Sequence, residues 1–308
     1  MDATVESFLD IDEQASRLVG YDQHYQQQGR GRFRGQFLTQ HLAEDVSIFI
    51  EQCNLPLLQR GSVPSGVVTL QFLLAAGADC ILNGQRFSTD SVVMMAGGSS
   101  FDHVSSADMR ICVVHLPAAV VEDLLPAVHA DTLFVRDPAL SARLRRLVTA
   151  AVKRDASADV LLAAEFGSIA REFIFAHRPR PGRSRTERAV FSRALSVIDA
   201  QLDWPLRIPE LSRSIGVSRR TLENAFRTHL GHGPAKHIRL ARLNAVRRAL
   251  STGAGSTASI GDIAAGVGIW HLGRLAKDFR ELFGQRPREL LPVSESRSGP
   301  QTPRSEAD

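Results

Sequence analysis

The sequence predicts an α+β protein in which a hairpin-rich N-terminal β-barrel with flanking helices precedes an all-α C-terminal domain. Three observations support this prediction. Short β-branched and aromatic segments fill the range 33–116, apolar residues then recur at helical spacing, and the last third of the chain repeats a helical pattern. At 308 residues the chain has room for two domains.

The predicted strands lie between residues 33 and 116. The clearest of them are the segments 46–53, 67–76, 80–82, 91–96 and 109–116. Asn83-Gly84 predicts a tight hairpin, because both central positions of a type I′ turn need a positive φ. Hairpins at such regular intervals favour an antiparallel barrel or a jelly roll. Residues 1–32 are polar and rich in glutamine, and we expect them to form a loosely packed arm.

Residues 117–177 change to a helical period, with Leu162, Phe166, Ile169 and Phe173 on one face. We expect these helices to pack against the barrel or against a second copy of it. The stretch 178–188 contains two prolines, a glycine and many charges, which predicts a linker. The second domain is then expected over residues 189–292, and a disordered tail over residues 293–308.

Charge is divided unevenly along the chain. Residues 178–308 hold 23 Lys and Arg against 12 Asp and Glu, whereas residues 1–177 hold 14 against 21. The C-terminal part is therefore suited to bind a polyanion and the N-terminal part is not.

The composition also indicates the compartment. Three widely spaced cysteines, Cys53, Cys80 and Cys112, argue against a disulfide framework and fit a reducing cytosol. The first residues lack the features of a secretory signal, and the longest apolar run is too short to cross a bilayer. We expect a cytoplasmic protein.

A first helix-turn-helix unit is predicted around Gly216, which can supply a left-handed turn. Before it, Leu211 and Ile215 form the inner stripe of a short helix. After it, Ser218 can cap a second helix by accepting a hydrogen bond from a free backbone N–H.

The second helix of this unit has an apolar face and a polar face. Leu222 and Phe226 lie one turn apart on the inner side, and Arg220, Asn224 and Arg227 share the outer side. Arginine can read the edge of guanine and asparagine that of adenine, so this face suits a DNA major groove.

A second unit repeats the first 53 positions later. The matching pairs are Leu222 and Leu275, Phe226 and Phe279, Arg227 and Arg280, Leu230 and Phe283, Gly231 and Gly284, and Pro234 and Pro287. We expect its turn at Gly266 and Gly268, with Arg274 and Lys277 on the outer side of its second helix. The repeat indicates two similar supersecondary units.

Between the units, residues 234–250 predict one helix that fixes their spacing. Its arginines, Arg239, Arg242, Arg247 and Arg248, are expected to face outward. For a lone unit the alternative is a helical hairpin bundle with a solvated basic face. The repeat and the basic charge of the domain argue against that alternative.

Residues 206–290 resemble the DNA-binding domain of the AraC/XylS family of bacterial regulators. The resemblance is carried by LSRSIGVSRRTLENAF (211–226), GHGPAKHIRLARLNAVRRAL (231–250) and IGDIAAGVGIWHLGRLAKDFRELFGQRPREL (260–290). The run 268–274 is most similar to the XylS-like branch, whose members often respond to small aromatic acids or other catabolic substrates. The resemblance implies that residues 33–177 are a cupin-like, effector-binding and dimerisation barrel.

The residues expected to bind DNA are Ser218, Arg219, Arg220, Thr221, Asn224, Arg227, Arg274 and Lys277. The resemblance places base reading on Arg220 and Asn224 in the first unit and on Arg274 and Lys277 in the second. The sequence departs from the family pattern at Ile269, Leu272 and Gly273. We therefore expect the second unit to make fewer base contacts and to rely more on phosphates.

Neither a metal nor another cofactor is expected. The N-terminal histidines, His24, His41, His103, His115 and His129, include no His-x-His pair of the kind used by cupin enzymes. Tyr21 and Tyr25 are expected in a frayed terminus, and Trp204 and Trp270 as packing residues. Because phosphate-binding loops, nucleophile elbows and paired carboxylates are also missing from the sequence, we do not expect an enzyme.

The sequence thus predicts a ligand-responsive transcription regulator, an activator of catabolic or metabolic genes, that reads two successive major grooves. Its expected partners are double-stranded promoter DNA, RNA polymerase, an unidentified small-molecule effector and a second copy of the chain, with no membrane. Two alternatives stay open. One is a cupin-type oxygenase fused to a DNA-binding tail, and the other is an architectural DNA binder without an effector.

Overall fold

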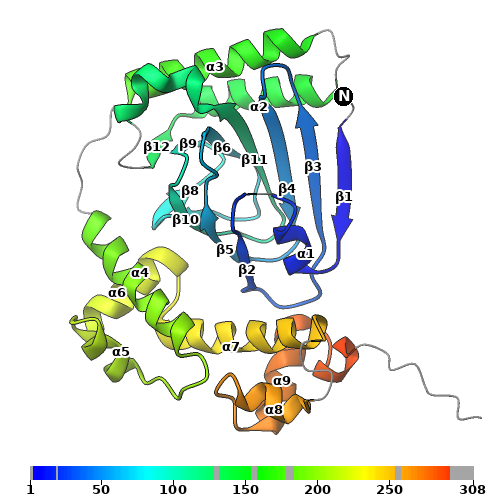
Figure 1. Cartoon of the computed structure of the whole chain (residues 1–308), viewed down its shortest axis with the longest axis vertical. Coiled ribbons are helices and arrows are strands. Elements are labelled where there is room, and N and C mark those ends of the chain that lie inside the picture. Colours follow the sequence, from blue (N-terminus) through cyan, green and yellow to red (C-terminus); the bar gives the residue numbers. More distant parts are fainter. Residues whose placement is uncertain are drawn as a thin grey trace, which may run out of the picture.

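The computed structural model describes residues 3–18, 20–127, 132–153, 158–177, 184–253 and 258–291. A β-rich N-terminal domain carries two long helices on one side, and a helical C-terminal domain packs against its opposite side (Figure 1). The predicted α+β class, with flanking helices on the first domain and helices alone in the second, is confirmed.

The larger of two antiparallel sheets has seven strands. In spatial order they are β1 (Thr4–Phe8), β3 (Gly35–His41), β4 (Ser47–Cys53), β11 (Met109–Pro117), β6 (Val67–Ala75), β9 (Ser91–Ala96) and β12 (Leu133–Arg136). Side chains alternate between the two faces of a strand. In β6, for example, Leu70 and Phe72 pack toward the helices while Leu73 packs toward the second sheet.

The smaller sheet has five strands. In spatial order they are β2 (His24–Gln27), β5 (Leu57–Ser62), β10 (Ser100–Val104), β7 (Cys80–Leu82) and β8 (Gln85–Phe87). Asn83 and Gly84 join β7 to β8 with φ of 52° and 77°, as the predicted hairpin requires. Among the described residues the two sheets are open layers around a shared core rather than one closed barrel.

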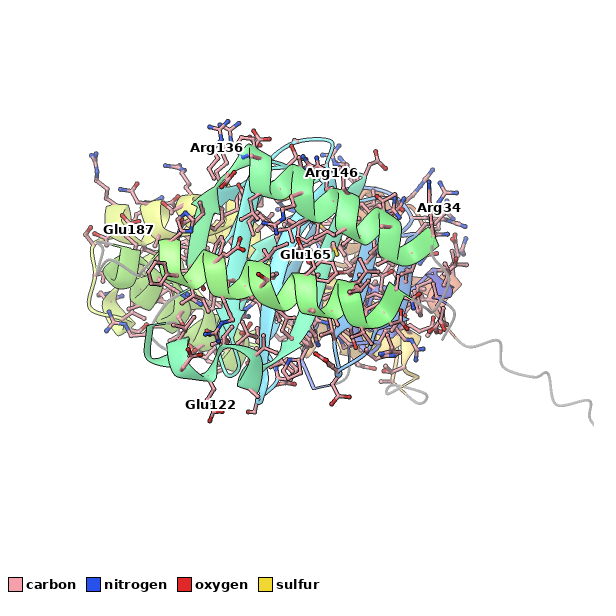
Figure 2. All side chains as sticks on the ribbon, turned by 90° about the horizontal axis from the view of Figure 1, so that it is seen from above. Arg34, Glu122, Arg136, Arg146, Glu165 and Glu187 are labelled. Carbon is pink, nitrogen blue, oxygen red and sulfur yellow. The ribbon has the colours of Figure 1, made fainter. Side chains whose placement is uncertain are left out.

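Helices cover the outer face of the seven-stranded sheet. They are η1 (Ala118–Ala127), α2 (Pro138–Lys153) and α3 (Asp159–Ala176). Figure 2 shows α2 and α3 lying side by side across the strands. Leu144 of α2 and Phe166 of α3 are fully buried in the core that these helices form with the sheet.

The first 32 residues differ from the loosely packed arm that we expected. β1 pairs along its length with β3, and α1 (Ile11–Ala15) closes the end of the smaller core. Tyr21 and Tyr25 are buried in that core, so they do not belong to a frayed terminus. The first residues are ordered because β1 pairs with β3, more than 25 residues later in the chain. The composition of residues 1–32 alone gives no sign of this pairing.

The C-terminal domain consists of helices. They are α4 (Ser184–Ala200), α5 (Ile208–Ser214), α6 (Arg219–Leu230), α7 (Pro234–Ser251), α8 (Ile260–Ala265), α9 (Leu272–Phe283) and η3 (Pro287–Leu290). The last five residues of the expected linker, 184–188, already belong to α4. Residues 178–183 of that linker, His129 and the expected tail 293–308 lie outside the described residues.

The two domains are joined by specific contacts along α7. The backbone N–H of Gln27 donates to Oδ1 of Asn244 at 2.8 Å, and its side-chain amide donates to the carbonyl of Leu282 at 2.7 Å. Leu58 of β5 is fully buried in the core that contains α4 and α6. The N-terminal domain therefore contacts both halves of the helical domain.

The outward direction expected for the α7 arginines is wrong for two of the four. Arg247 is buried and pairs with Asp10 at 2.6 Å and with Asp12, and Arg248 pairs with Asp12 at 3.1 Å. Arg248 lies nine residues after Arg239, which at about 100° per residue puts it on the opposite side of the helix. That side faces the N-terminal domain.

Candidate DNA-binding surface

The first helix-turn-helix unit is built as the sequence predicts. Gly216 has φ of 72° between α5 and α6, a left-handed conformation that suits glycine. Ser218 caps α6, its Oγ accepting a hydrogen bond from the N–H of Thr221 at 3.0 Å. Leu222 and Phe226 are fully buried, and they fix α6 against α4 and α5.

The outer face of α6 presents most of the predicted DNA-binding residues to solvent. The exposed ones are Ser218, Arg219, Arg220, Thr221, Asn224 and Arg227. Arg227 lies 3.6 Å from Glu223, one turn earlier, so part of its charge is balanced locally. Among the described residues, Arg220 and Asn224 form no ion pair or side-chain hydrogen bond and are available to a ligand.

The second unit is similar, but its turn is one residue longer. Gly268 has φ of 72°, as Gly216 has, whereas Gly266 is in ordinary helical conformation. From Gly216 to the cap of α6 is two residues, and from Gly268 to the cap of α9 is three. That cap is His271, which makes no side-chain cap bond to any described residue.

The exposed face of α9 carries fewer polar groups than that of α6. Arg274 is exposed and lies 3.6 Å from Asp278, and Lys277 is exposed without an ion pair among the described residues. Leu272 and Gly273 occupy the exposed start of the helix. The two predicted sets thus differ: α6 presents Arg220 and Asn224, which have no partner among the described residues, whereas α9 presents Arg274, paired with Asp278, and Lys277.

Helix α7 holds the two units in one fixed arrangement. Pro234 starts it, and its buried residues pack on the first unit near Ile238 and on the second near Leu243 and Val246. Arg239 bridges to Asp278 of α9 at 2.7 Å. In Figure 1, α7 runs as a continuous rod from α6 to α9.

A groove of about 680 Å³ lies between the two units. Predicted residues Arg219 and Arg274 line it together with Arg207, Arg239 and Arg242, which the sequence did not single out for DNA binding. Lys277 lines a separate groove on another side of α9. The sequence does show that arginines are frequent near the two turns. It does not show that they line one groove, because this depends on how the two units pack against each other.

Both tryptophans differ from our expectation of packing residues. Trp204 and Trp270 are each 65% exposed, and Trp270 lines the groove between the units. The carbonyls of Leu202 and Trp204 instead accept hydrogen bonds from Arg242. Arg242 of α7 therefore holds the backbone of the segment between α4 and α5 by hydrogen bonds, while the Trp204 side chain stays exposed.

Two buried histidines distinguish the core of the first unit. His229 stacks on Phe191 at 4.3 Å between ring centroids, and His237 lies 5.6 Å from Phe226. Burial lowers the pKa of His229 to about 4 and that of His237 to about 3. Both side chains are therefore neutral near neutral pH, and the cationic surface of the unit comes from arginine.

These features define a protein with a DNA-binding domain made of two helix-turn-helix units. Residues 211–292 match the model of a family described as "Helix-turn-helix domain". The XylDLEGF operon transcriptional activator of Pseudomonas putida is 33% identical over 101 residues, which cover 33% of this chain and 32% of that protein. A thc operon regulatory protein of Rhodococcus erythropolis is 30% identical over 98 residues, covering 32% and 30%. The C-terminal third of the chain is therefore similar to the helix-turn-helix domains of these bacterial transcription regulators.

The similarity to these curated relatives spans about a third of their length. A solved structure, the AraC-like transcriptional activator CuxR, covers 86% of this chain and 100% of its own at 14% identity, with a TM-score of 0.47. At that score the two structures differ too much for one to inform the other. Within the described residues, no helix is long and apolar enough to span a membrane, and no group of three or more His, Cys, Asp or Glu side chains could hold a metal.

Proposed function

We propose that this protein is a sequence-specific DNA-binding transcription regulator whose helices α6 and α9 enter two successive major grooves. The observation that supports this most is the pair of similar units, each with an exposed cationic helix, joined by α7. With 18 residues, α7 is roughly 27 Å long at about 1.5 Å per residue. Successive major grooves on one face of a duplex are about 34 Å apart, a distance of the same order as the length of α7, which carries one unit near each of its ends.

The eight predicted residues divide by chemistry. Arg220 and Asn224 are the base readers, since they are exposed and able to form bidentate hydrogen bonds. Ser218, Arg219 and Thr221 surround the N-terminus of α6, where hydroxyls, a cation and free N–H groups suit a phosphate. In this proposal Arg227, Arg274 and Lys277 also contact phosphates or base edges, with Lys277 the simplest phosphate contact.

The rest of the proposal concerns the whole chain. Residues 33–177 form an effector-binding and dimerisation domain, residues 178–188 a linker, residues 189–292 the DNA-binding domain and residues 293–308 a tail. The protein acts in the cytoplasm as an activator of catabolic or metabolic genes, without enzymatic activity, and works with RNA polymerase. Exposed apolar side chains on α3, Leu161 and Phe175, lie four turns apart on one face and suit packing against a second copy.

Selection of bound duplexes from a random DNA library tests the proposal. We expect one enriched, asymmetric site with two parts about 10 base pairs apart. The purified protein should bind that site at least about 10³-fold more tightly than random DNA at physiological salt. Failure to enrich any sequence, with tight but uniform binding, would instead support an architectural DNA binder.

A further inference from the structure

Residues 27–32, from the last residue of β2 onward, form a strap that lies against both helix-turn-helix units. Beside the first unit, Oε1 of Gln28 lies 3.0 Å from Nε2 of His232, in the turn that follows α6. On α7, Asn244 bonds both backbone groups of Gln27, its Oδ1 accepting from the N–H at 2.8 Å and its Nδ2 donating to the carbonyl at 3.1 Å. Beyond α7 the strap reaches the second unit.

There the strap completes the C-terminal end of α9. The last four carbonyls of an α-helix have no partner within the helix, and the carbonyl of Leu282 is one of them. It accepts hydrogen bonds from the N–H of Gly31 at 2.9 Å and from Nε2 of Gln27 at 2.7 Å. Arg30 also forms an ion pair with Glu281. The N-terminal domain therefore supplies donors that the recognition helix of the second unit lacks.

Gln27 is the central residue of this contact. Its side chain is 2% exposed, and its Nε2 lies 2.8 Å from the carbonyls of both Gly29 and Gly31. Asn244, its partner on α7, is 1% exposed. Because these polar groups are shut away from water, each bond that is lost leaves a buried group without a partner. One side chain thus holds the shape of the strap and ties it to α9.

The first unit is held in another way. Its polar contacts with the N-terminal domain reach α4, where Asp199 accepts from Arg60 at 2.8 Å and Arg188 donates to the carbonyl of Ser100 at 2.5 Å. Within the described residues, α6 itself forms no hydrogen bond with the N-terminal domain. The recognition helix that the N-terminal domain holds by hydrogen bonds is therefore α9.

Two ties fix α9 relative to α6, namely α7 within the helical domain and the strap across it. We propose that the strap sets the spacing and angle at which α9 meets DNA, and that Gln27 is its positioning residue. A change in the N-terminal domain that moves the strap acts on the second unit more than on the first. The effect on DNA rests on the proposed function, whereas the tie between the strap and α9 does not.

The spacing between the two parts of the DNA site is a direct measure of this tie. One added base pair moves the second part by about 3.4 Å and turns it by about 35° around the helix axis. A rigid pair of recognition helices cannot follow that movement. The wild type should therefore bind a site lengthened or shortened by one base pair at least about tenfold more weakly than the selected site.

Gln27→Met removes the amide donor and keeps an unbranched side chain of similar length. With α9 released, the penalty for one base pair should fall to about threefold or less, and preference should relax only at the base pairs that α9 contacts. Gln52→Met replaces an exposed glutamine of β4 and should behave as the wild type. Equilibrium binding to the selected site and to its two spacing variants measures the effect. A spacing penalty in Gln27→Met equal to that of the wild type would overturn the proposal.

Asn244→Ala is a second variant, which decides the matter if Gln27→Met does not fold. It removes both bonds between α7 and the strap and alters no residue of α9. The same smaller spacing penalty is expected. A uniform loss of affinity with the full spacing penalty would mean that the variant only destabilises the protein, and this result would overturn the proposal.

Hydrogen exchange of the full chain without DNA tests the tie by itself. In both variants the amides of residues 279–284 should exchange at least about threefold faster, while those of α6 keep the wild-type rate. Unchanged exchange in residues 279–284 would refute the strap, whatever the DNA result. Faster exchange there, together with wild-type protein that prefers no DNA sequence, would refute the proposed function alone.

Discussion

The two helix-turn-helix units share a backbone plan and differ in what they present. α6 and α9 each end in a left-handed glycine, Gly231 with φ of 71° and Gly284 with φ of 66°. At the 53-residue offset, however, Arg220 of α6 corresponds to Gly273 of α9, and Asn224 corresponds to Lys277. The second helix therefore keeps the position of a reader without the side chain best suited to read guanine.

The cores differ as well as the surfaces. His229 and His237 of the first unit correspond to Leu282 and Leu290 of the second. The first unit thus places polar groups in its core and on its proposed DNA-binding face, while the second has an apolar core and presents Arg274 and Lys277 on its surface. The residues that repeat thus specify the fold of each unit. The residues that differ determine which chemical groups each unit presents on its surface and in its core.

The largest effect is expected from replacing the proposed base readers of the first unit, Arg220 and Asn224. Arg220→Ala or Asn224→Ala should each cost about 1–3 kcal/mol of binding free energy and relax preference at a few adjacent base pairs. Arg274→Ala or Lys277→Ala should cost less, act about one helical turn away, and reduce the dependence of affinity on salt. Equilibrium binding to single-base variants of the selected site, at several salt concentrations, measures both effects.

A matched control is Arg193→Ala, which removes an exposed arginine of α4 and should change binding little. If all four variants of α6 and α9 altered preference at the same base pairs, the two units would not occupy separate grooves. A larger loss from Lys277→Ala than from Arg220→Ala would reverse the assigned roles.

Much of the fold was predictable because its signals are local. The segments 80–82 and 91–96 match β7 and β9 residue for residue, since each is a short apolar run bounded by turn or polar residues, such as Asn83-Gly84 after β7. The arm was mispredicted because β1 becomes ordered only by pairing with β3. Open sheets rather than a closed barrel also depend on long-range pairing, which composition does not reveal.

In the candidate DNA-binding surface, too, the features set by neighbouring residues were predictable and those set by distant contacts were not. Ser218 and Gly216 have the roles that a helix-turn-helix sequence requires, because capping and left-handed turns are set by neighbouring residues. The direction of Arg247 was not predictable, since it depends on Asp10 in another domain. The contact between the strap and α9 had no local signal either, because Gln27 and Leu282 belong to different domains.

The next largest effect is on stability below neutral pH. His237 has its pKa lowered by burial to about 3, whereas an unfolded histidine has a pKa near 6.5. Below pH 6.5 the unfolded state binds a proton that the folded state excludes, so stability is full above that pH and falls as the pH drops toward 3. Between pH 7.5 and 5.5 this loss is about 1.4 kcal/mol for each such histidine.

Urea unfolding of His237→Leu at the two pH values measures this contribution. The variant carries the residue that the second unit has at this position, and its stability should fall less on acidification than that of the wild type. His41→Gln replaces an exposed histidine and should keep the wild-type pH dependence. Equal pH dependence in all three proteins would show that His237 is not held neutral.

A smaller effect is expected from removing the helix caps. Ser218→Ala and Ser259→Ala should each destabilise the protein by about 1 kcal/mol, because each hydroxyl accepts a bond from a helix N–H. Only Ser218 adjoins a predicted reader, so only its replacement should also weaken DNA binding. Denaturant unfolding and binding to the selected site distinguish the two, and equal losses of DNA affinity would contradict the special position of Ser218.

The smallest expected effect concerns Gly273. Its replacement tests the comparison between the two helix-turn-helix units most directly. A side chain added here meets no described atom within 4 Å, and glycine is less stable than alanine by roughly 0.5–1 kcal/mol in a helix interior, which sets the upper limit for Gly273 in the first turn of α9. Gly273→Ala should therefore stabilise the protein by no more than about that amount, without changing DNA affinity. Gly273→Arg should give a similar gain in stability, and it also places a guanidinium where the first unit has Arg220. If α9 lies in a major groove, this variant should bind the selected site more tightly and with a steeper salt dependence than Gly273→Ala does. Equal DNA affinity in the two variants would mean that this end of α9 does not reach the duplex.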